Sequence, residues 1–278
     1  MPKKENIRLM FDSIAPEYDA FNHLTSLGID RSWRRRALRF VGKAAGAAPG
    51  EPVRVLDVAC GTGDFSLAIA RHLARNSREG AARGSKRPPE PSSGQTLPPW
   101  SVTGMDISEG MLEVMMTKVA KASLQPAAFG PDGLPADGIY AETGDCCSMR
   151  YADGTFDAVT VAFGVRNFED REKALREVLR VLKPGGRFVM LELGIPRNPV
   201  VRWAYKFYFS KIMPLVGGKM SGNKAAYRYL PASVLSFPGP KGWCATMEAA
   251  GFANVCHRAL SLGICRLYTG EKPRPVRL

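Results

Sequence analysis

The run from Val53 to Ala59, which ends in Cys60-Gly-Thr-Gly-Asp64, is the feature that most constrains how this chain folds. Its short, β-branched composition is typical of a buried strand. Apolar residues at helical spacing follow from Phe65 to Leu73. Glycines at such a turn let the backbone come close to a bound ligand, although a tight turn without a ligand can have the same sequence. The segment therefore predicts the first strand, turn and helix of an α/β domain.

Strand-like and helix-like segments continue to alternate along the chain. We expect further strands at 102–106, 139–143, 155–162 and 187–193, helices over 171–182 and near 241–250, and two closing strands. Another helix begins at Ser108, whose side chain can cap it, with Met111, Leu112 and Met115 on its apolar face. Five strands with intervening helices predict a doubly wound, mostly parallel sheet with right-handed crossovers.

Other segments depart from this alternation within what we predict to be a single domain over residues 1–278. A helical preface covers 1–45, with Pro16 as a break and a second helix entering near Asp30. A flexible insertion rich in Ser, Gly, Arg and Pro covers 76–99, and a second Pro- and Gly-rich loop covers 125–138. A helical lid covers 197–240.

The lid is rich in aromatic residues, for which core packing and an apolar acceptor pocket are both open interpretations. They are Trp203, Tyr205, Phe207, Tyr208, Phe209, Tyr227, Tyr229 and Phe237.

The net charge of +13 fits a nucleic-acid partner, an anionic membrane surface or simply a solvated basic surface. One basic cluster, Arg31, Arg34, Arg35, Arg36 and Arg39, has the spacing of a polar helix face. The six cysteines form no Cys-x-x-Cys pair, so we expect buried free thiols and no zinc site. No run of ~20 apolar residues occurs and the first residues are polar, so we expect a cytoplasmic protein.

The predicted strand ends carry the candidate binding residues. Gly61, Thr62 and Gly63 form the first turn, and Ser66 stands where a dinucleotide fingerprint has its third glycine. Asp106 ends the second strand, where its carboxylate can accept hydrogen bonds from both ribose hydroxyls of an adenosyl ligand, as it also could from NAD. At the third strand end, Asp145 could bind an adenine amino group and the Cys146 backbone a ring nitrogen; structural capping is the alternative for Asp145.

Four further motifs complete the pattern: Tyr18-Asp19-x-x-Asn22-x-x-x-Ser26-x-Gly28-x-Asp30-x-x-Trp33, Phe163-Gly-Val-Arg-Asn167, Arg180-Val-Leu-Lys-Pro-Gly-Gly186 with Glu192, and Tyr227-Arg-Tyr-Leu230. With these motifs the chain resembles the UbiE/MenG family of quinone-biosynthesis C-methyltransferases over nearly its full length outside the two insertions. The family often has Ser at the positions of Ala162 and Gly194, so a hydroxyl contact to the cofactor is in doubt there.

The resemblance implies a class I methyltransferase: a Rossmann-like, mostly parallel sheet with an antiparallel C-terminal strand, N-terminal helices and a helical lid. It implies S-adenosyl-L-methionine as methyl donor, S-adenosyl-L-homocysteine as product and no metal. The implied cofactor contacts are Gly61, Thr62, Gly63, Asp106, Asp145 and Cys146.

The implied acceptor is a prenylated quinol, demethylmenaquinol, with a ubiquinone-precursor benzoquinol as an alternative. For catalysis we expect Arg166 to stabilise a developing phenolate and Asn167 to orient the ring, with a surface salt bridge as the alternative for Arg166. Tyr18, His23 or a water could act as base.

Rival interpretations are a methyltransferase acting on RNA or on another small molecule, a nicotinamide oxidoreductase and a catalytically silent quinone-binding protein. We expect no nucleic-acid partner, since no recognised RNA-binding module is present. Peripheral membrane contact and a homodimer both stay open.

Overall fold

The computed structural model describes residues 3–41, 52–84, 100–124, 126–130, 132–209 and 224–275. Within these residues eight strands form one sheet in the order β3-β4-β2-β1-β5-β6-β8-β7. The strands are β1 (Val53–Val58), β2 (Trp100–Asp106), β3 (Ala128–Phe129), β4 (Pro135–Thr143), β5 (Phe156–Ala162), β6 (Leu182–Leu193), β7 (Ala253–Leu260) and β8 (Cys265–Glu271). Strands β4, β2, β1, β5 and β6 are parallel, and β8 is antiparallel to both β6 and β7. The predicted doubly wound sheet with an antiparallel C-terminal strand is confirmed.

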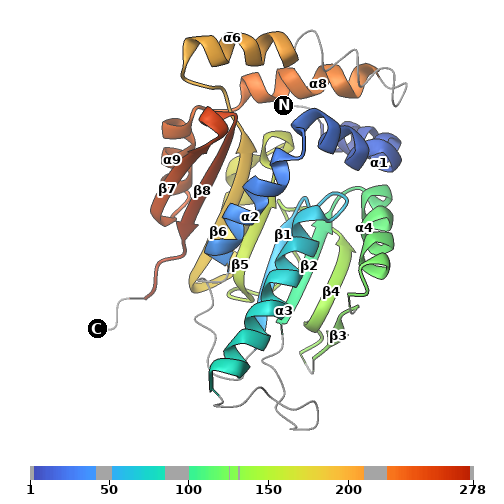
Figure 1. The fold of residues 1–278 in the computed structure, drawn as a ribbon. Helices are drawn as coiled ribbons and strands as arrows, with labels where there is room; N and C mark the ends of the chain where they lie inside the picture. Colours follow the sequence, from blue (N-terminus) through green and yellow to red (C-terminus); the bar gives the residue numbers. More distant parts are fainter. Residues whose placement is uncertain are drawn as a thin grey trace.

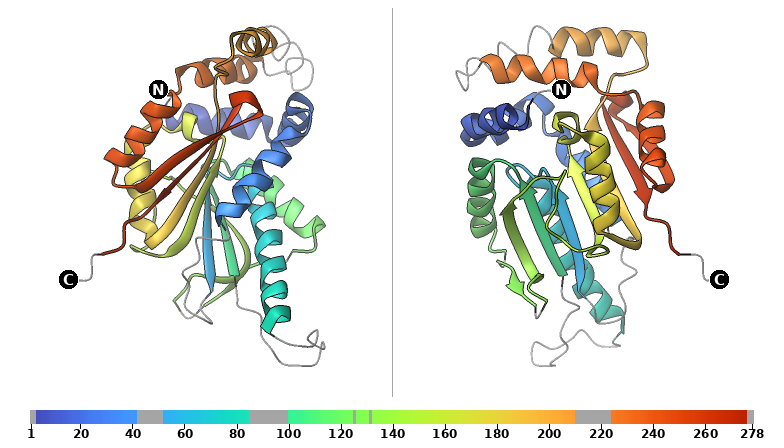
Figure 2. Two further views of the ribbon diagram at one scale, coloured as in Figure 1. Left: turned by 60° about the vertical axis from the view of Figure 1, so that its left-hand side comes forward. Right: turned by 180° about the vertical axis from the view of Figure 1, so that it is seen from behind.

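Helices cover both faces of the sheet and one of its edges (Figures 1 and 2). They are α1 (Lys4–Ser26), α2 (Ile29–Val41), α3 (Asp64–Gly84), α4 (Glu109–Lys121), α5 (Arg171–Val181), α6 (Pro199–Phe207), α8 (Lys224–Ser236) and α9 (Pro240–Ala249). Two 3-10 turns, η1 (Val165–Asn167) and η3 (Ser261–Gly263), lie between them. One hydrophobic cluster joins the sheet to α2, α3 and α4, and a second joins its other face to α5 and α9.

The two-faced core follows from the alternation of side chains along each strand. In β1, Val55 belongs to the cluster under α2–α4 and Leu56 to the cluster under α5 and α9; both are fully buried. Burying one such side chain contributes about 1.5–3 kcal/mol, so two buried faces fix the register of the strands.

Helix α1 runs without interruption through Pro16, so the predicted break there is wrong. Proline removes one backbone donor, which costs helix stability. Here the buried side chains of Ile14 and Phe21, on either side of it, anchor the helix to the rest of the protein. The helix ends instead at Leu27 and Gly28, both with positive φ angles.

Element boundaries differ from the prediction in other places. Helix α3 continues to Gly84, so the part of the predicted flexible insertion from 76 to 84 is helical, and the rest of it lies outside the described residues. Strand β3 and the start of β4 pair within the predicted second loop. Strand β6 begins at Leu182, ahead of the Lys-Pro-Gly-Gly turn expected to separate it from α5.

Other local predictions are confirmed. The Ser108 hydroxyl caps α4 by accepting a hydrogen bond from the backbone of Met111. The six cysteines are free, as expected, but only Cys146 and Cys265 are buried; Cys60, Cys147 and Cys244 are partly exposed and Cys256 is exposed. No helix in the described part of the chain combines the length and the apolar character needed to cross a lipid bilayer.

Candidate active site

The carboxyl ends of β1, β2, β4 and β5 lie at one edge of the sheet, and α1 crosses that edge (Figure 1). Open α/β sheets bind ligands at this edge. Two cavities lie there, each lined by residues of α1 and of the strand ends. We call them the Asp106 cavity and the Arg166 cavity, after a buried charged residue in the wall of each.

The Asp106 cavity has a volume of about 450 Å³, within the range of sites that enclose small ligands. Of the predicted cofactor residues, Gly61, Asp106, Asp145 and Cys146 line it, Thr62 lines the Arg166 cavity, and Gly63 lines neither. The structure therefore brings together the residues predicted from three separate strand ends.

The Asp106 carboxylate is buried and is oriented by the backbone around it. Its Oδ2 accepts a hydrogen bond from the Gly61 N–H at 2.8 Å, and its Oδ1 accepts one from the Ser108 N–H at 2.9 Å. Burial raises the pKa of Asp106, against the lowering effect of these two donors. Because an ionised carboxylate has about four acceptor positions, each oxygen can still accept a hydrogen bond from a ligand hydroxyl.

The Asp145 carboxylate lies at the far end of the same cavity. Lys4 of α1 donates a hydrogen bond to its Oδ2 at 2.8 Å, and the Cys147 N–H donates to its Oδ1 at 2.9 Å. Burial opposes ionisation, but the hydrogen bond from Lys4 holds the pKa of Asp145 below its usual value. This partner could not be predicted from local sequence, since Lys4 and Asp145 are far apart along the chain.

Gly63 serves the packing of the turn after β1. Its φ angle is +77°, and a Cβ atom there would lie 2.4 Å from Cγ of Met115 on α4. Its neighbour Thr62 donates its hydroxyl to Oδ1 of Asp19 at 2.5 Å, which ties the turn to α1. The glycine turn is therefore fixed from two sides by helices.

The two cavities share a wall, formed by Phe11, Tyr18, Ala59, Gly61, Ala162 and Phe163. Ala59 and Phe163 have φ angles of +50° and +63°, which residues other than glycine rarely adopt. Such backbone costs about 1–3 kcal/mol per residue and persists only where the surrounding structure imposes it. Ala162, one of the two positions where the sequence departs from the family pattern, places only a methyl group in this wall.

The Arg166 cavity, of about 430 Å³, lies under α1, α2, α6 and α8 and is largely apolar. Of the aromatic residues of the predicted lid, Tyr205, Tyr208, Phe209 and Tyr229 line it. Trp203 and Phe207 are exposed, and Phe237 packs on Trp243 with ring centroids 5.0 Å apart. The Tyr227 side chain is outside the described part. Some rings of the predicted lid therefore line an apolar pocket, one packs in the core and others are exposed to solvent.

Arg166 is the buried cation of the second cavity. Its Nη1 donates to Oε1 of Glu192 at 2.8 Å and to the carbonyl oxygen of Phe163. Burial would lower the pKa of Arg166, but the fully buried Glu192 carboxylate raises it above its ordinary value. Its Nε atom has no hydrogen-bond partner within the part of the chain that the structure describes. A buried, charged donor without a partner, on a residue that lines a cavity, suits a ligand oxygen.

Asn167 lies on the other side of η1 and lines the Asp106 cavity. Its Oδ1 accepts a hydrogen bond from the Tyr229 hydroxyl at 3.1 Å, and Tyr229 lines the Arg166 cavity. The contact therefore links the two cavities and connects the lid helix α8 to the sheet.

The two candidate bases lie in different surroundings. Tyr18 lines both cavities, and burial raises its pKa, although the charge of Arg166 counteracts part of the rise. Its phenol is therefore protonated at neutral pH. His23 lines neither cavity; its Nδ1 lies 3.3 Å from Asp30 and its Nε2 lies 3.5 Å from Asp64.

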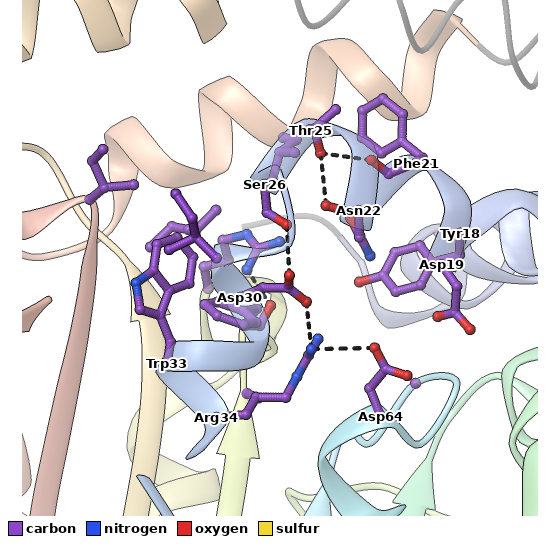
Figure 3. A pocket seen from close by; sticks show the side chains of 18 of the residues that line it. Tyr18, Asp19, Phe21, Asn22, Thr25, Ser26, Asp30, Trp33, Arg34 and Asp64 are labelled. Carbon is purple, nitrogen blue, oxygen red and sulfur yellow. Dashed lines mark hydrogen bonds and ion pairs between the residues drawn. The ribbon is translucent and has the colours of Figure 1, made fainter. Parts of the chain in front are cut away.

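An ion-pair network at the wall of the Arg166 cavity joins α1, α2, α3 and α4, and Figure 3 shows the part of it formed by Asp30, Arg34 and Asp64. Arg34 donates to Asp30 at 2.5 Å and lies 3.3 Å from Asp64, while Lys118 contacts both Asp64 and Asp19. The prediction that Arg34 belongs to a polar helix face is wrong, because its side chain turns inward to these carboxylates. The spacing of Asp30 and Arg34, four residues apart on one helix, was the available signal.

Two groups of described side chains have the ligand types and spacing of a metal site: Asp145 with Cys146 and Cys147, and His23 with Asp30 and Asp64. Lys4 already pairs with Asp145, and Arg34 with Asp30. Each group thus has a positively charged partner from the chain itself.

Comparison with known proteins identifies the family of this chain. The model of the ubiE/COQ5 methyltransferase family matches residues 1–272. A Geobacter sulfurreducens relative named ubiquinone/menaquinone biosynthesis C-methyltransferase UbiE is 42% identical over 97% of this chain and 90% of its own length. Proteins named demethylmenaquinone methyltransferase from Bacteroides fragilis and Thermus thermophilus are 39% and 38% identical, over 97% and 95% of this chain and 94% and 100% of their own.

Solved structures share the fold at low sequence identity. A SAM-dependent methyltransferase from Thermotoga maritima superposes with a TM-score of 0.53 at 16% identity and covers 95% of this chain and 99% of its own. The CMeT domain of the citrinin polyketide synthase gives a TM-score of 0.56 at 16% identity, over 91% of this chain and 56% of the other. At these identities the likeness concerns the fold alone.

Proposed function

The chain belongs to the ubiE/COQ5 methyltransferase family, and from that premise we propose that it transfers a methyl group from S-adenosylmethionine to a ring carbon of demethylmenaquinol. The observation that supports this most is the pair of cavities with a common wall. One contains carboxylates suited to a nucleoside. The other is largely apolar, and Arg166 is the most deeply buried cation among its described lining residues, since Arg34 is less buried and pairs with Asp30 and Asp64.

The residues of the Asp106 cavity fit an adenosyl ligand. Asp106 accepts the ribose hydroxyls through the acceptor positions that its backbone donors leave open. Asp145 and Cys146 receive the adenine, and Lys4 closes over it from α1. When bound, S-adenosylmethionine supplies an electrophilic methyl group on a positively charged sulfur. Ala59, Gly61 and Ala162, the small residues of the shared wall, leave room for that group to face the Arg166 cavity.

The residues of the Arg166 cavity fit a quinol ring. A ring carbon becomes nucleophilic when the neighbouring hydroxyl, with a phenol-like pKa near ~10, loses its proton. Arg166 stabilises the resulting phenolate through its unpartnered Nε, since Glu192 and Phe163 hold the other side of the guanidinium in place. Most of the rate enhancement then comes from holding the reacting atoms about 3–3.5 Å apart.

Tyr18 and Asn167 have positioning roles in this proposal. Because its pKa is raised, Tyr18 acts as a hydrogen-bond donor at the shared wall. The hydroxyl proton of the quinol passes to water. Once the methyl group has moved from sulfur to the ring carbon, that carbon gives up its own hydrogen as a proton, the ring becomes aromatic again and the oxygen is reprotonated. Asn167 accepts a hydrogen bond from the Tyr229 hydroxyl and so fixes the tyrosine ring in the wall of the Arg166 cavity.

A benzoquinol precursor of ubiquinone is the second candidate acceptor. The name of the Geobacter sulfurreducens relative covers both quinone pathways, and an apolar cavity accepts either ring.

Purified protein with radiolabelled S-adenosylmethionine and reduced, short-tailed acceptors tests the proposal. We expect label in the naphthoquinol, less in the benzoquinol and none in bulk RNA. Transfer to RNA but to neither quinol would contradict it, and faster transfer to the benzoquinol would replace the naphthoquinol as the natural acceptor.

A further inference from the structure

Helix α6 has two apolar faces. Val201, Ala204 and Tyr205 line the Arg166 cavity on one side. On the other side Val200, Trp203 and Phe207 are 74%, 71% and 51% exposed, and the two rings stack with centroids 6.0 Å apart. Large apolar side chains gathered on one exposed helix face mark a site that contacts another apolar phase.

The turn between α1 and α2 adds to this surface. Leu24, Leu27 and Ile29 are all exposed there. The Tyr208 hydroxyl donates to the carbonyl oxygen of Thr25 at 2.9 Å, which holds the end of α6 beside this turn. In Figure 1, α6 lies at the outer end of the molecule, beyond α1 and α8. We call Leu24, Leu27, Ile29, Val200, Trp203 and Phe207 the outer apolar face.

This face surrounds the entrance of the acceptor cavity. Leu27 and Ile29 both line the Arg166 cavity and are exposed, so they mark its mouth. The cavity volume of about 430 Å³ is at the low end for a site that encloses a drug-sized ligand. A quinol ring fits within it, but a prenyl tail of more than a few units must leave through the mouth and needs apolar surroundings there.

The charge of the sequence segment that contains α6 identifies the partner. Between Gly194 and Met247 the sequence contains no Asp or Glu but eight basic residues: Arg197, Arg202, Lys206, Lys211, Lys219, Lys224, Arg228 and Lys241. Arg202 and Lys206 are on α6 itself, between its exposed apolar residues, and both are exposed. Basic residues beside Trp and Phe are the composition of helices that lie in the headgroup region of an anionic bilayer.

The same charge disfavours a second copy of this chain as the occupant. Two such faces would place like charges opposite one another, which costs association free energy. An anionic lipid surface instead gains from each basic residue brought near it.

We infer that the outer apolar face docks on an anionic lipid bilayer, with Trp203 and Phe207 inserted at the headgroup level and the mouth of the Arg166 cavity facing the acyl chains. The inference rests on the proposed function in that a bilayer-dissolved quinol then enters the cavity without crossing water. No spanning helix is needed, because an amphipathic face and a basic segment together give reversible binding.

Co-sedimentation of the full chain with vesicles tests the docking directly. We expect binding to vesicles of phosphatidylcholine mixed with phosphatidylglycerol and much weaker binding to phosphatidylcholine alone. Trp203→Ser with Phe207→Ser should lower the partition coefficient at least about tenfold. The matched control, Met116→Ser with Phe129→Ser, removes two exposed apolar side chains far from α6 and should leave it unchanged.

A second pair of variants separates local charge from net charge. Arg202→Glu with Lys206→Glu should abolish the preference for anionic vesicles, lowering binding by about tenfold or more. Arg71→Glu with Lys121→Glu changes the net charge equally on exposed positions of α3 and α4, and should have a smaller effect. Thermal unfolding of each variant verifies that the fold is intact.

Equal binding of the parent protein to both vesicle types, or unchanged binding of the α6 variants, would overturn the inference. These measurements contain no quinol, so they stand apart from the proposed function. Methylation of a short-tailed quinol in solution without binding to vesicles would refute the docking alone. Binding to vesicles without methylation of any quinol would refute the proposed function alone.

Discussion

Glu192 accepts two hydrogen bonds from Arg166, one from the guanidinium Nη1 at 2.8 Å and one from the backbone N–H at 3.1 Å. Both side chains are buried. The buried Glu192 carboxylate holds the guanidinium of Arg166 in a single orientation. The Nε of the same side chain, which lines the acceptor cavity, has no hydrogen-bond partner among the described residues. The pair therefore fixes a positive charge before the acceptor arrives, which is the condition for stabilising a charge that develops during reaction.

Replacing Arg166 should slow turnover far more than it weakens cofactor binding. Removing one donor that stabilises a developing oxyanion lowers kcat by about 10²–10³-fold, so we expect a loss of this size for Arg166→Ala. Since our proposal assigns the cofactor to the Asp106 cavity, the Kd for S-adenosylhomocysteine should change less than about threefold. Kinetics with a short-tailed quinol and calorimetric titration give the two numbers.

Arg166→Lys is the matched variant. It keeps a positive charge beside Glu192, whereas Arg166→Ala leaves that buried carboxylate without its cationic partner and lowers the free energy of unfolding by about 3–5 kcal/mol. Turnover of the lysine variant should lie between those of the parent and the alanine variant. Equal losses in kcat and cofactor affinity would remove Arg166 from the catalytic role.

Asp106→Ala should weaken binding of S-adenosylhomocysteine at least tenfold, about 1.4 kcal/mol, because the ribose hydroxyls lose a charged acceptor. Asp132→Ala is the control, since Asp132 is an exposed carboxylate paired with Arg54 and lies in neither cavity. Calorimetric titration measures both variants. An unchanged Kd for Asp106→Ala would mean that the ribose binds elsewhere.

Gly63→Ala and Gly28→Ala should differ in their effect on stability. Both glycines have φ near +70°, at +77° and +71°, so alanine has the same backbone cost of about 1–2 kcal/mol at each. Only at Gly63 does the new methyl group overlap Met115, which adds about 1–3 kcal/mol. Urea unfolding measures the difference. Equal losses at the two positions would show that contact with Met115 is not the constraint on Gly63.

Asp57 should make the free energy of unfolding depend on pH. Ser66 and Thr160 each donate a hydroxyl to it at 2.6 Å, yet burial raises the pKa of Asp57 to about 6. In the unfolded chain the pKa is about 3.9. Between the two values the folded state binds a proton that the unfolded state lacks, so the free energy of unfolding falls as pH rises through this window, by about 3 kcal/mol in total.

Asp57→Asn lacks the titrating group, so other groups cancel in the comparison of the variant with the parent protein. Urea unfolding from about pH 4 to about pH 7 covers most of this window and should show a difference between the two that changes by about 2 kcal/mol. A difference that stays constant with pH would contradict the raised pKa.

The sequence was sufficient where a local pattern decides the structure. The apolar run of β1 and its glycine turn, the Ser108 cap and the carboxylates of Asp106 and Asp145 at strand ends were all predictable. Each depends on residues within one strand–turn–helix unit, and parallel strands bring their carboxyl ends to the same edge.

The remainder depends on contacts between distant segments. Pro16 has a local cost that favours a break, and only the packing of α1 on the rest of the protein outweighs it. The pairing of Lys4 with Asp145 joins residues far apart in the chain, so no local sequence pattern predicts it. Of the two carboxylates that Arg34 meets, Asp30 is its neighbour on α2, but Asp64 comes from α3 and could not be foreseen from local sequence.

A crystal structure with S-adenosylhomocysteine tests the account most directly, through the position of the ligand's sulfur atom. The account predicts that sulfur at the wall shared by the two cavities, beside Ala59 and Ala162, with the ribose on Asp106 and the Nε of Arg166 across the wall. A sulfur buried away from that wall, or a ligand outside the Asp106 cavity, would contradict it.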